Sequence, residues 1–263
     1  MRYSIKLSYN GSEFCGWQIQ PCSPSVQQCL EEALTKLLRT RISVTGAGRT
    51  DTGVNAIGYV AHFDTPSEID PAATAYKLNA ILPHSVTVHG IQPKSDDFHA
   101  RFSVSKREYT YFLHRVKDPF MTGFSYLCAY PDLDFEAMNR AASHLIGTHD
   151  FSCFEKAGAD NKTSVCTVSE AVWRKYVPSH VAVTGGTGSG DFWYFRICAD
   201  RFLRNMVRAV VGTLIEVGRG KRTEEDFASL ILEYTPGQEH VSHRSKAGES
   251  VPGHALFLSK ITY

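Results

Sequence analysis

The chain has 263 residues, of which 43% are hydrophobic and 21% are charged, a composition typical of a soluble globular enzyme with a substantial core. It carries 28 Lys and Arg residues against 27 Asp and Glu residues. This balance lacks the strong basic excess typical of nucleic-acid-binding domains, so any site for a polyanion must be a local patch. The seven cysteines are odd in number and form no CxxC pair, which argues against a disulfide framework and against a thiolate zinc site. We expect free thiols in a soluble, cytoplasmic protein, since no apolar run approaches the roughly 18 residues of a membrane span.

The first half of the chain alternates predicted strands and helices. Polar and apolar residues alternate over residues 3–9, which predicts a strand. A helix is expected next, with Ser25 and Gln28 at capping-box spacing, and a second helix later, with Asp70 as N-cap and Pro71 at its first position. The predicted helices cover residues 25–38 and 70–82, and the predicted strands cover residues 3–9, 42–47, 56–64, 85–92 and 108–115.

The second half continues with similar elements. The expected helices cover residues 134–147, 200–218 and 224–234, and the expected strands cover residues 164–177, 191–199 and 254–263. The irregular spacing of strands and helices indicates an α+β fold with mixed α and β elements rather than a parallel doubly wound sheet. The stretch KDPFMTG interrupts the periodicity, and we predict one domain over residues 1–115 and another over residues 116–263.

The stretch GAGRTDTGVNA, residues 46–56, holds the first candidate for chemistry. It places Arg49 and Asp51 in a glycine-rich loop between two predicted strands, where catalytic groups are common because the sheet fixes the loop. Arg49 could keep the carboxylate of Asp51 ionised and oriented. The alternative is a turn aspartate that hydrogen-bonds its own backbone. The loop alone does not decide between these two interpretations.

Two other segments concentrate basic residues. In the predicted helix 200–218, Arg201, Arg204 and Arg208 fall at positions i, i+3 and i+7, as one positive stripe that is either a solvated edge or a phosphate contact. In ARFSVSKREYTYFLHR, residues 100–115, basic and aromatic residues alternate as on a surface that binds phosphates and stacked bases, although strand aromatics are usually core residues. The eleven histidines include no HExxH motif, and we expect no metal site.

Together these motifs resemble the TruA-type tRNA pseudouridine synthases. GAGRTDTGVNA followed by VAHFD is similar to the family signature that carries the nucleophilic aspartate. The other matching blocks, in the same order, are YNGSEFCGWQIQP with SVQQCLEEAL, LNAILP with FHARFSVSKREYTY, GTHDFSCF, and FLRNMVRAVVGTLIEVG. These blocks span nearly the whole chain.

The resemblance implies two similar domains, each an antiparallel sheet flanked by helices, around a central RNA-binding cleft. It implies a homodimer that binds the anticodon arm of tRNA and isomerises uridine to pseudouridine at positions 38, 39 and 40. The reaction exchanges a C1′–N1 bond for a C1′–C5 bond without net redox change, which agrees with the lack of a cofactor motif. Neither DNA nor a membrane is an expected partner.

The resemblance also assigns roles to residues of this chain. It implies that Asp51 is the nucleophile, that Tyr109 stacks on the flipped target base, and that Arg208 pairs with the aspartate. Leu256 would line the pocket. The phosphate contacts would come from Arg49, Arg101, Lys106, Arg107 and Arg204, and these contacts would position the RNA without reading its sequence.

Three positions depart from the family pattern. The family usually has His at the position of Asn55, Gln at that of Tyr59, and Gly at that of Ala255. Asn55 carries no charge at any pH, which leaves the role of this position open, and an alanine would be strained where a glycine has positive φ. A tRNA-binding or RNA-folding protein with secondary or lost catalysis stays an alternative, and so does a glycoside or nucleoside hydrolase, which would need a second carboxylate.

Overall fold

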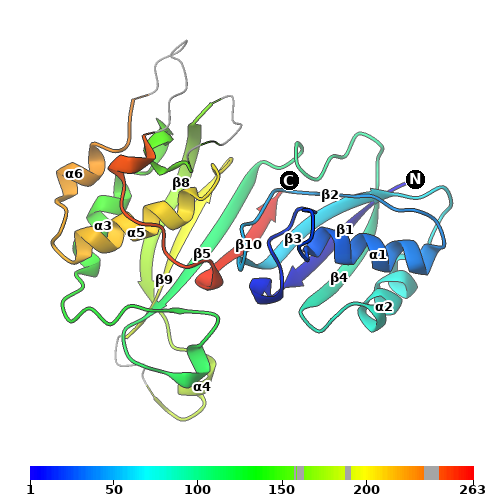
Figure 1. Cartoon of the computed structure of the whole chain (residues 1–263), viewed down its shortest axis with the longest axis horizontal. Helices are drawn as coiled ribbons and strands as arrows, with labels where there is room; N and C mark the ends of the chain where they lie inside the picture. Colours follow the sequence, from blue (N-terminus) through cyan, green and yellow to red (C-terminus); the bar gives the residue numbers. More distant parts are fainter. Residues whose placement is uncertain (157, 159–162, 187–190, 234–242) are drawn as a thin grey trace. The chain divides into compact units, whose positions relative to one another are not determined.

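The structure is a computed structural model that describes residues 1–156, 158, 163–186, 191–233 and 243–263 (Figure 1). The chain divides into two compact units, Met1–Ser105 with Phe257–Tyr263 (unit 1) and Lys106–Leu256 (unit 2). Each unit combines a mostly antiparallel sheet with helices, which confirms the predicted mixed α and β fold class. The predicted domains, 1–115 and 116–263, stay a prediction. The two compact units divide the chain differently, because the strand at 106–114 joins unit 2 and the C-terminal strand joins unit 1.

Unit 1 is built on three antiparallel strands in the order β4–β1–β3. Strand β2 pairs antiparallel with β3, and β10 pairs parallel with β3 where Phe257 and Leu258 face Asn55 and Ala56. Helix α1 contacts α2, and α2 packs against β4. The strands are β1 (Arg2–Tyr9), β2 (Val44–Gly46), β3 (Asn55–Asp64), β4 (Val86–Lys94) and β10 (Leu256–Thr262), and the helices are α1 (Val26–Leu38) and α2 (Pro71–Ile81).

Local sequence signals explain how these elements begin. In β1, Ile5 and Leu7 are fully buried while Lys6 between them is exposed, the period of two expected for a strand with one covered face. The side chain of Ser25 accepts a hydrogen bond from the backbone N–H of Gln28 at the start of α1, as predicted. Only the Ser25 half of the capping box forms, and the side-chain Nε2 of Gln28 donates to Glu32. Asp70 caps α2 by accepting from two backbone N–H groups, as predicted.

Unit 2 is built on an antiparallel sheet in the order β5–β9–β8–β7, with the short β6 parallel to β5. Helices α3, α5 and α6 contact one another, and α3 packs against β8. The strands are β5 (Lys106–His114), β6 (Tyr126–Leu127), β7 (Gly147–Asp150), β8 (Val165–Lys175) and β9 (Phe192–Ala199), and the helices are α3 (Phe135–Ser143), α4 (Ser179–Ala182), α5 (Met206–Gly218) and α6 (Glu224–Ala228). Short 3₁₀ turns lie at Gly11–Glu13, Pro119–Met121, Ser152–Phe154, Arg244–Lys246 and Gly253–Ala255.

The predicted helix 200–218 is wrong in its first six residues. Helix α5 begins at Met206, because Asn205 before it has a left-handed backbone with φ of 66°. Eleven of its thirteen residues are buried. The predicted helix 224–234 is too long as well: α6 ends at Ala228, and Leu232 leaves the helical path to exchange two backbone hydrogen bonds with Asp150.

Two predicted properties of the chain concern its thiols and its apolar segments. All seven cysteines are free thiols, as predicted. Within the described residues, none of the helices has the length and apolar character needed to cross a membrane.

Candidate active site

The loop that carries Arg49 and Asp51 connects β2 to β3 in unit 1, as the sequence predicted. Asp51 is half-buried and Arg49 is exposed. The backbone N–H of Val54 donates to the carbonyl of Asp51 at 3.1 Å and closes a tight turn. Gly53 in this turn has φ of 75°, a left-handed conformation that side chains with a Cβ rarely adopt. The glycine therefore sets how the chain turns immediately after the aspartate.

The segment 10–17 holds this loop from the other side. The backbone N–H of Trp17 donates to the carbonyl of Thr50 at 3.3 Å, and the N–H of Gly53 donates to the carbonyl of Phe14 at 3.4 Å. A Cβ on Gly16 would collide with the carbonyl of Thr50. The glycine in the stretch FCGWQ is therefore explained by the close approach of its backbone to that of Thr50.

Three aromatic side chains lie beside the loop, and we call them the aromatic cluster: Tyr9, Trp17 and Tyr59. The rings of Trp17 and Tyr59 stack with centroids 4.1 Å apart at 26°, and the rings of Tyr9 and Tyr59 lie 5.6 Å apart. All three are at most 4% exposed. A Cβ on Gly46 would collide with the Tyr59 hydroxyl and the Trp17 ring, so this glycine at the end of β2 makes room for the cluster.

Two positions that depart from the family pattern have a structural explanation. Asn55 is 1% exposed, and its side-chain oxygen accepts a hydrogen bond from the backbone N–H of Gly11 at 2.8 Å. It therefore links β3 to the turn at Gly11–Glu13 inside unit 1. Ala255 is fully buried and is not among the residues with positive φ, so alanine causes no backbone strain there.

The predicted base-stacking residue, Tyr109, lies on β5 in unit 2. It is half-buried, and its ring and that of Phe202 form a T-shaped pair with centroids 5.1 Å apart at 88°. Arg107 on the same strand donates to the carbonyl of Asp200 at 2.8 Å, and Lys106 is exposed. The segment that follows β9 therefore packs against the basic and aromatic end of β5.

Arg208 lies in the first turns of α5 and is half-buried. Its Nε donates to the carbonyl of Val251 at 2.8 Å, and the N–H of Val251 donates back to the carbonyl of Arg208 at 3.2 Å. This reciprocal pair fixes the base of the guanidinium group. The buried Leu256 lies five residues further along the same segment and begins β10.

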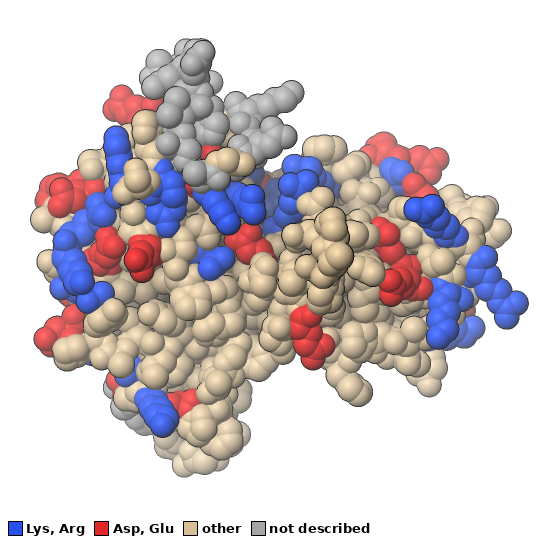
Figure 2. All heavy atoms as spheres, in the orientation of Figure 1, with Lys and Arg blue, Asp and Glu red and all other residues tan. Residues whose placement is uncertain are grey.

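The predicted positive stripe on one helix is wrong. Arg201 and Arg204 precede α5, so helical spacing does not relate them to Arg208. Arg204 is exposed, and its carbonyl accepts from the N–H of Lys156 at 3.0 Å. Figure 2 shows basic side chains gathered on the part of unit 2 that carries α5 and α6, with acidic side chains among them. The basic surface is therefore assembled from several segments.

Some residues that hold α5 in place carry no local sequence signal. The hydroxyl of Ser250 accepts from the guanidinium of Arg244 at 2.9 Å and from the side-chain amide of Asn205. Burial lowers the pKa of Arg244 below its usual value. A Cβ on Gly212 would collide with the carbonyl of Glu249, so the helix needs a glycine where this segment crosses it. The contacts of this group with Asn205 and Gly212 join residues 45 and 37 positions apart in the chain, so no local pattern reveals them.

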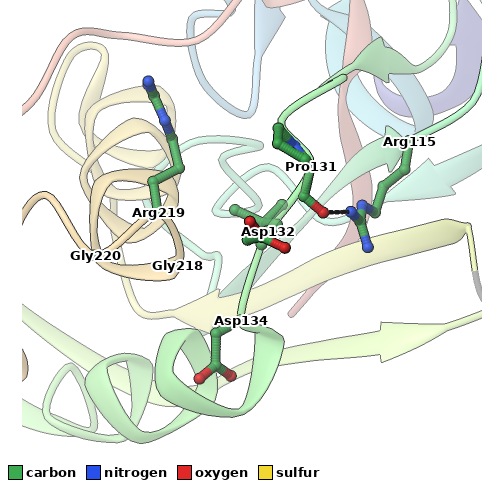
Figure 3. Close-up of a pocket in the computed structure, with 8 residues that line it drawn as sticks. Arg115, Pro131, Asp132, Asp134, Gly218, Arg219 and Gly220 are labelled. Carbon is green, nitrogen blue, oxygen red and sulfur yellow. Dashed lines mark hydrogen bonds between the residues drawn. The ribbon is translucent and has the colours of Figure 1, made fainter.

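A hollow of about 480 Å³ in unit 2 contains none of the predicted site residues (Figure 3). Arg115 points to the carbonyl of Pro131 and donates to it, while the guanidinium of Arg219 lies 3.4 Å over the ring of Tyr130. These contacts hold the segment before α3 against the residues that follow β5 and α5. Across the described ranges, no group of three or more His, Cys, Asp or Glu residues is arranged to hold a metal ion.

The predicted site residues fall into two sets, each positioned within its own unit. Unit 1 holds Arg49, Asp51 and Arg101, of which the first two share one loop. Unit 2 holds Lys106, Arg107, Tyr109, Arg204, Arg208 and Leu256. The aromatic cluster and Asn55 were not predicted as site residues, although the motif YNGSEFCGWQIQP contains two of the cluster residues.

Comparison with known proteins gives the family. Residues 7–103 and 141–263 match the family described as tRNA pseudouridine synthase. A tRNA pseudouridine synthase A of Parabacteroides distasonis is 47% identical over 263 residues, which cover 100% of this chain and 96% of that protein. Proteins with the same name are 45% identical in Bacteroides thetaiotaomicron, covering 100% of this chain and 90% of that protein, and 39% identical in Bacillus subtilis, covering 100% and 99%. The chain therefore belongs to the tRNA pseudouridine synthase family, whose members are isomerases.

Proposed function

We propose that this protein isomerises uridine to pseudouridine at positions 38, 39 and 40 in the anticodon stem-loop of tRNA, with Asp51 as the nucleophile. The observation that carries the proposal is the construction of the loop around Asp51. A closed turn, a glycine of positive φ and hydrogen bonds from the segment 10–17 fix its backbone, as expected where a single carboxylate must be held in place. Family membership supplies the reaction class.

In the proposed reaction, the ionised carboxylate of Asp51 attacks C1′ of the target nucleotide. The C1′–N1 bond breaks, and the base leaves with the bonding electron pair. The detached base turns within the site, C5 bonds to C1′, and the carboxylate is released. Finally C5 loses its proton and N1 gains one, so atoms and electrons balance without a redox partner.

Two residues of unit 2 would assist this step. Tyr109 would stack on the flipped base, an interaction worth about 1–3 kcal/mol per base. Arg208 would pair with the carboxylate of Asp51 and keep it ionised. Its hydrogen bond to the carbonyl of Val251 supports this role, because it restricts the direction in which the guanidinium points. Leu256 would supply an apolar wall.

Basic residues would bind the RNA backbone. Arg49, Arg101, Lys106 and Arg204 are all exposed, and Arg107 is half-buried on the same strand as Tyr109. Contacts of this kind position an RNA and make its affinity depend on salt. We further propose that the protein acts in the cytoplasm as a homodimer bound to the anticodon arm.

The test is release of tritium from an unmodified tRNA transcript labelled at C5 of uridine, with uridines at positions 38–40. Wild type should release tritium, whereas Asp51→Ala and the isosteric Asp51→Asn should release none above background. Asp96→Asn, which neutralises an exposed carboxylate of the same unit, is the matched control and should act like wild type.

Each other outcome has a definite meaning. Release by Asp51→Asn at the wild-type rate contradicts the role of Asp51. Tight tRNA binding by a wild type that releases no tritium supports the alternative of an RNA-binding or RNA-folding protein. Appearance of free uracil identifies a hydrolase.

A further inference from the structure

We infer that Tyr59 and Tyr9 are positioning residues for the reaction, because their hydroxyl groups hold the loop that presents Asp51. Neither hydroxyl has a place in the chemistry itself. The inference rests on the proposed role of Asp51 and adds to it the means by which this chain fixes the aspartate. Tyr59 is one of the positions where the sequence departs from the family pattern, so the inference concerns a feature of this chain.

The hydroxyl of Tyr59 bonds to the backbone of Gly48 in both directions. It donates to the carbonyl of Gly48, and it accepts from the N–H of the same residue at 3.4 Å. Because Tyr59 lies on β3 and is fully buried, its ring has no freedom to follow a moving loop. Stacking on Trp17, at 4.1 Å between ring centroids, fixes the ring further. One phenol group therefore anchors the loop three residues before Asp51.

The hydroxyl of Tyr9 anchors the loop at a second point. It lies 2.9 Å from the hydroxyl oxygen of Thr50, a buried hydrogen bond between residues 41 positions apart. Thr50 immediately precedes Asp51 and is only 8% exposed. The ring of Tyr9 also contacts the ring of Tyr59, at 5.6 Å and 59°. The two anchors thus belong to one aromatic cluster.

The placement of these hydrogen bonds points to an effect on catalysis. Gly48 and Thr50 flank Arg49, and the turn between Asp51 and Val54 closes the other side of the aspartate. The anchored atoms are backbone and hydroxyl groups of the loop rather than groups that would meet RNA. Loss of an anchor should therefore move the carboxylate without removing a contact to tRNA. A misplacement of about 1 Å at a reacting group lowers a rate by as much as about 100-fold.

The test measures kcat and KM by tritium release for Tyr59→Phe, Tyr9→Phe and the double variant. Phenylalanine keeps the ring and its stacking and removes only the hydroxyl. Each single variant should lower kcat about 10-fold and the double variant about 100-fold, with KM and the Kd for tRNA within about 2-fold of wild type. A purely structural role would not produce this split between kcat and KM.

Tyr3→Phe is the matched control. Tyr3 is also a buried tyrosine of unit 1, but its hydroxyl accepts from the backbone N–H of Ile69, away from the aspartate loop. The control should keep the wild-type kcat. All variants are compared at a temperature where circular dichroism shows them folded.

Two results would overturn the inference: a kcat of Tyr59→Phe equal to that of Tyr3→Phe, or a rise in KM at unchanged kcat. If either appears while Asp51→Asn is inactive, only the inference about the anchors fails. If Asp51→Asn keeps wild-type turnover, the proposed function of Asp51 fails first.

Discussion

Replacing Asn55 with alanine tests whether the position has a structural role or an RNA-binding role. The family usually has a histidine at this position, which could contact a phosphate or move a proton. In this chain Asn55 is 1% exposed, and its side-chain oxygen accepts a 2.8 Å hydrogen bond from the backbone N–H of Gly11. We therefore predict that Asn55→Ala lowers the stability of unit 1 and leaves the RNA contacts unchanged.

The size of the effect follows from burial. Alanine leaves the N–H of Gly11 buried without this acceptor, which costs about 1–3 kcal/mol. The volume of the lost amide group adds a cavity term, so we expect a total loss of about 2–4 kcal/mol. This is a large part of the roughly 5–15 kcal/mol by which folded proteins are stable. If Asn55 contacted a phosphate instead, its loss would weaken tRNA binding, with little change in the salt dependence because a neutral amide releases no counterion.

The assay has two parts. Urea unfolding, with hydrogen exchange of the peptide that contains residues 10–17, measures the stability of unit 1. Titration with tRNA measures the binding affinity. Asn79→Ala is the control, because Asn79 bonds both ways to the backbone of Val88 elsewhere in unit 1. It should destabilise the protein without faster exchange in residues 10–17. An unchanged urea midpoint together with weaker tRNA binding would refute the structural role of Asn55.

Three further predictions concern charge, pH and thiols. Arg101→Ala should weaken tRNA binding and reduce the salt slope by about 0.7–0.9, as measured by titration; an unchanged slope would exclude a phosphate contact. Burial and the nearby Arg2 lower the pKa of His62, whose Nδ1 accepts from the N–H of Ala100. Protonation of His62 is therefore less favourable in the folded state than in the unfolded state. The free energy of unfolding should be highest above pH about 6.5 and should fall as the pH drops below it. His62→Asn should reduce this fall, as measured by urea unfolding at several pH values. Iodoacetamide should label the exposed Cys22 well before Cys166, whose pKa burial raises to about 12; equal rates by mass spectrometry would contradict this.

Local signals in the sequence were sufficient for much of the fold. The caps of α1 and α2, at Ser25 and Asp70, act over three residues, and both were predicted. The hairpin from β2 through the aspartate loop to β3 follows from two short apolar runs around a glycine-rich stretch. Recognition of Asp51 as a candidate also needed only this loop and the motifs that resemble one family.

The start of α5 could not be predicted in this way. The sequence from Asp200 to Gly218 has helical periodicity throughout, yet Asn205 adopts a left-handed backbone and its side chain bonds to Ser250. Since Ser250 lies 45 residues further along the chain, no local pattern contains this contact. The positive stripe predicted for Arg201, Arg204 and Arg208 failed for the same reason.

The sequence by itself determined the family, the class of reaction and the loop that carries Asp51, because these depend on residue identities at short spacing. Only the tertiary structure decided how that loop is held. The hydroxyls of Tyr9 and Tyr59 form hydrogen bonds to Thr50 and Gly48 in the loop. The side-chain oxygen of Asn55 accepts a hydrogen bond from the backbone N–H of Gly11. Periodicity describes which face of a strand is buried, but it cannot show which backbone atom a buried hydroxyl or amide will meet. That choice depends on how strands distant in sequence pair and pack.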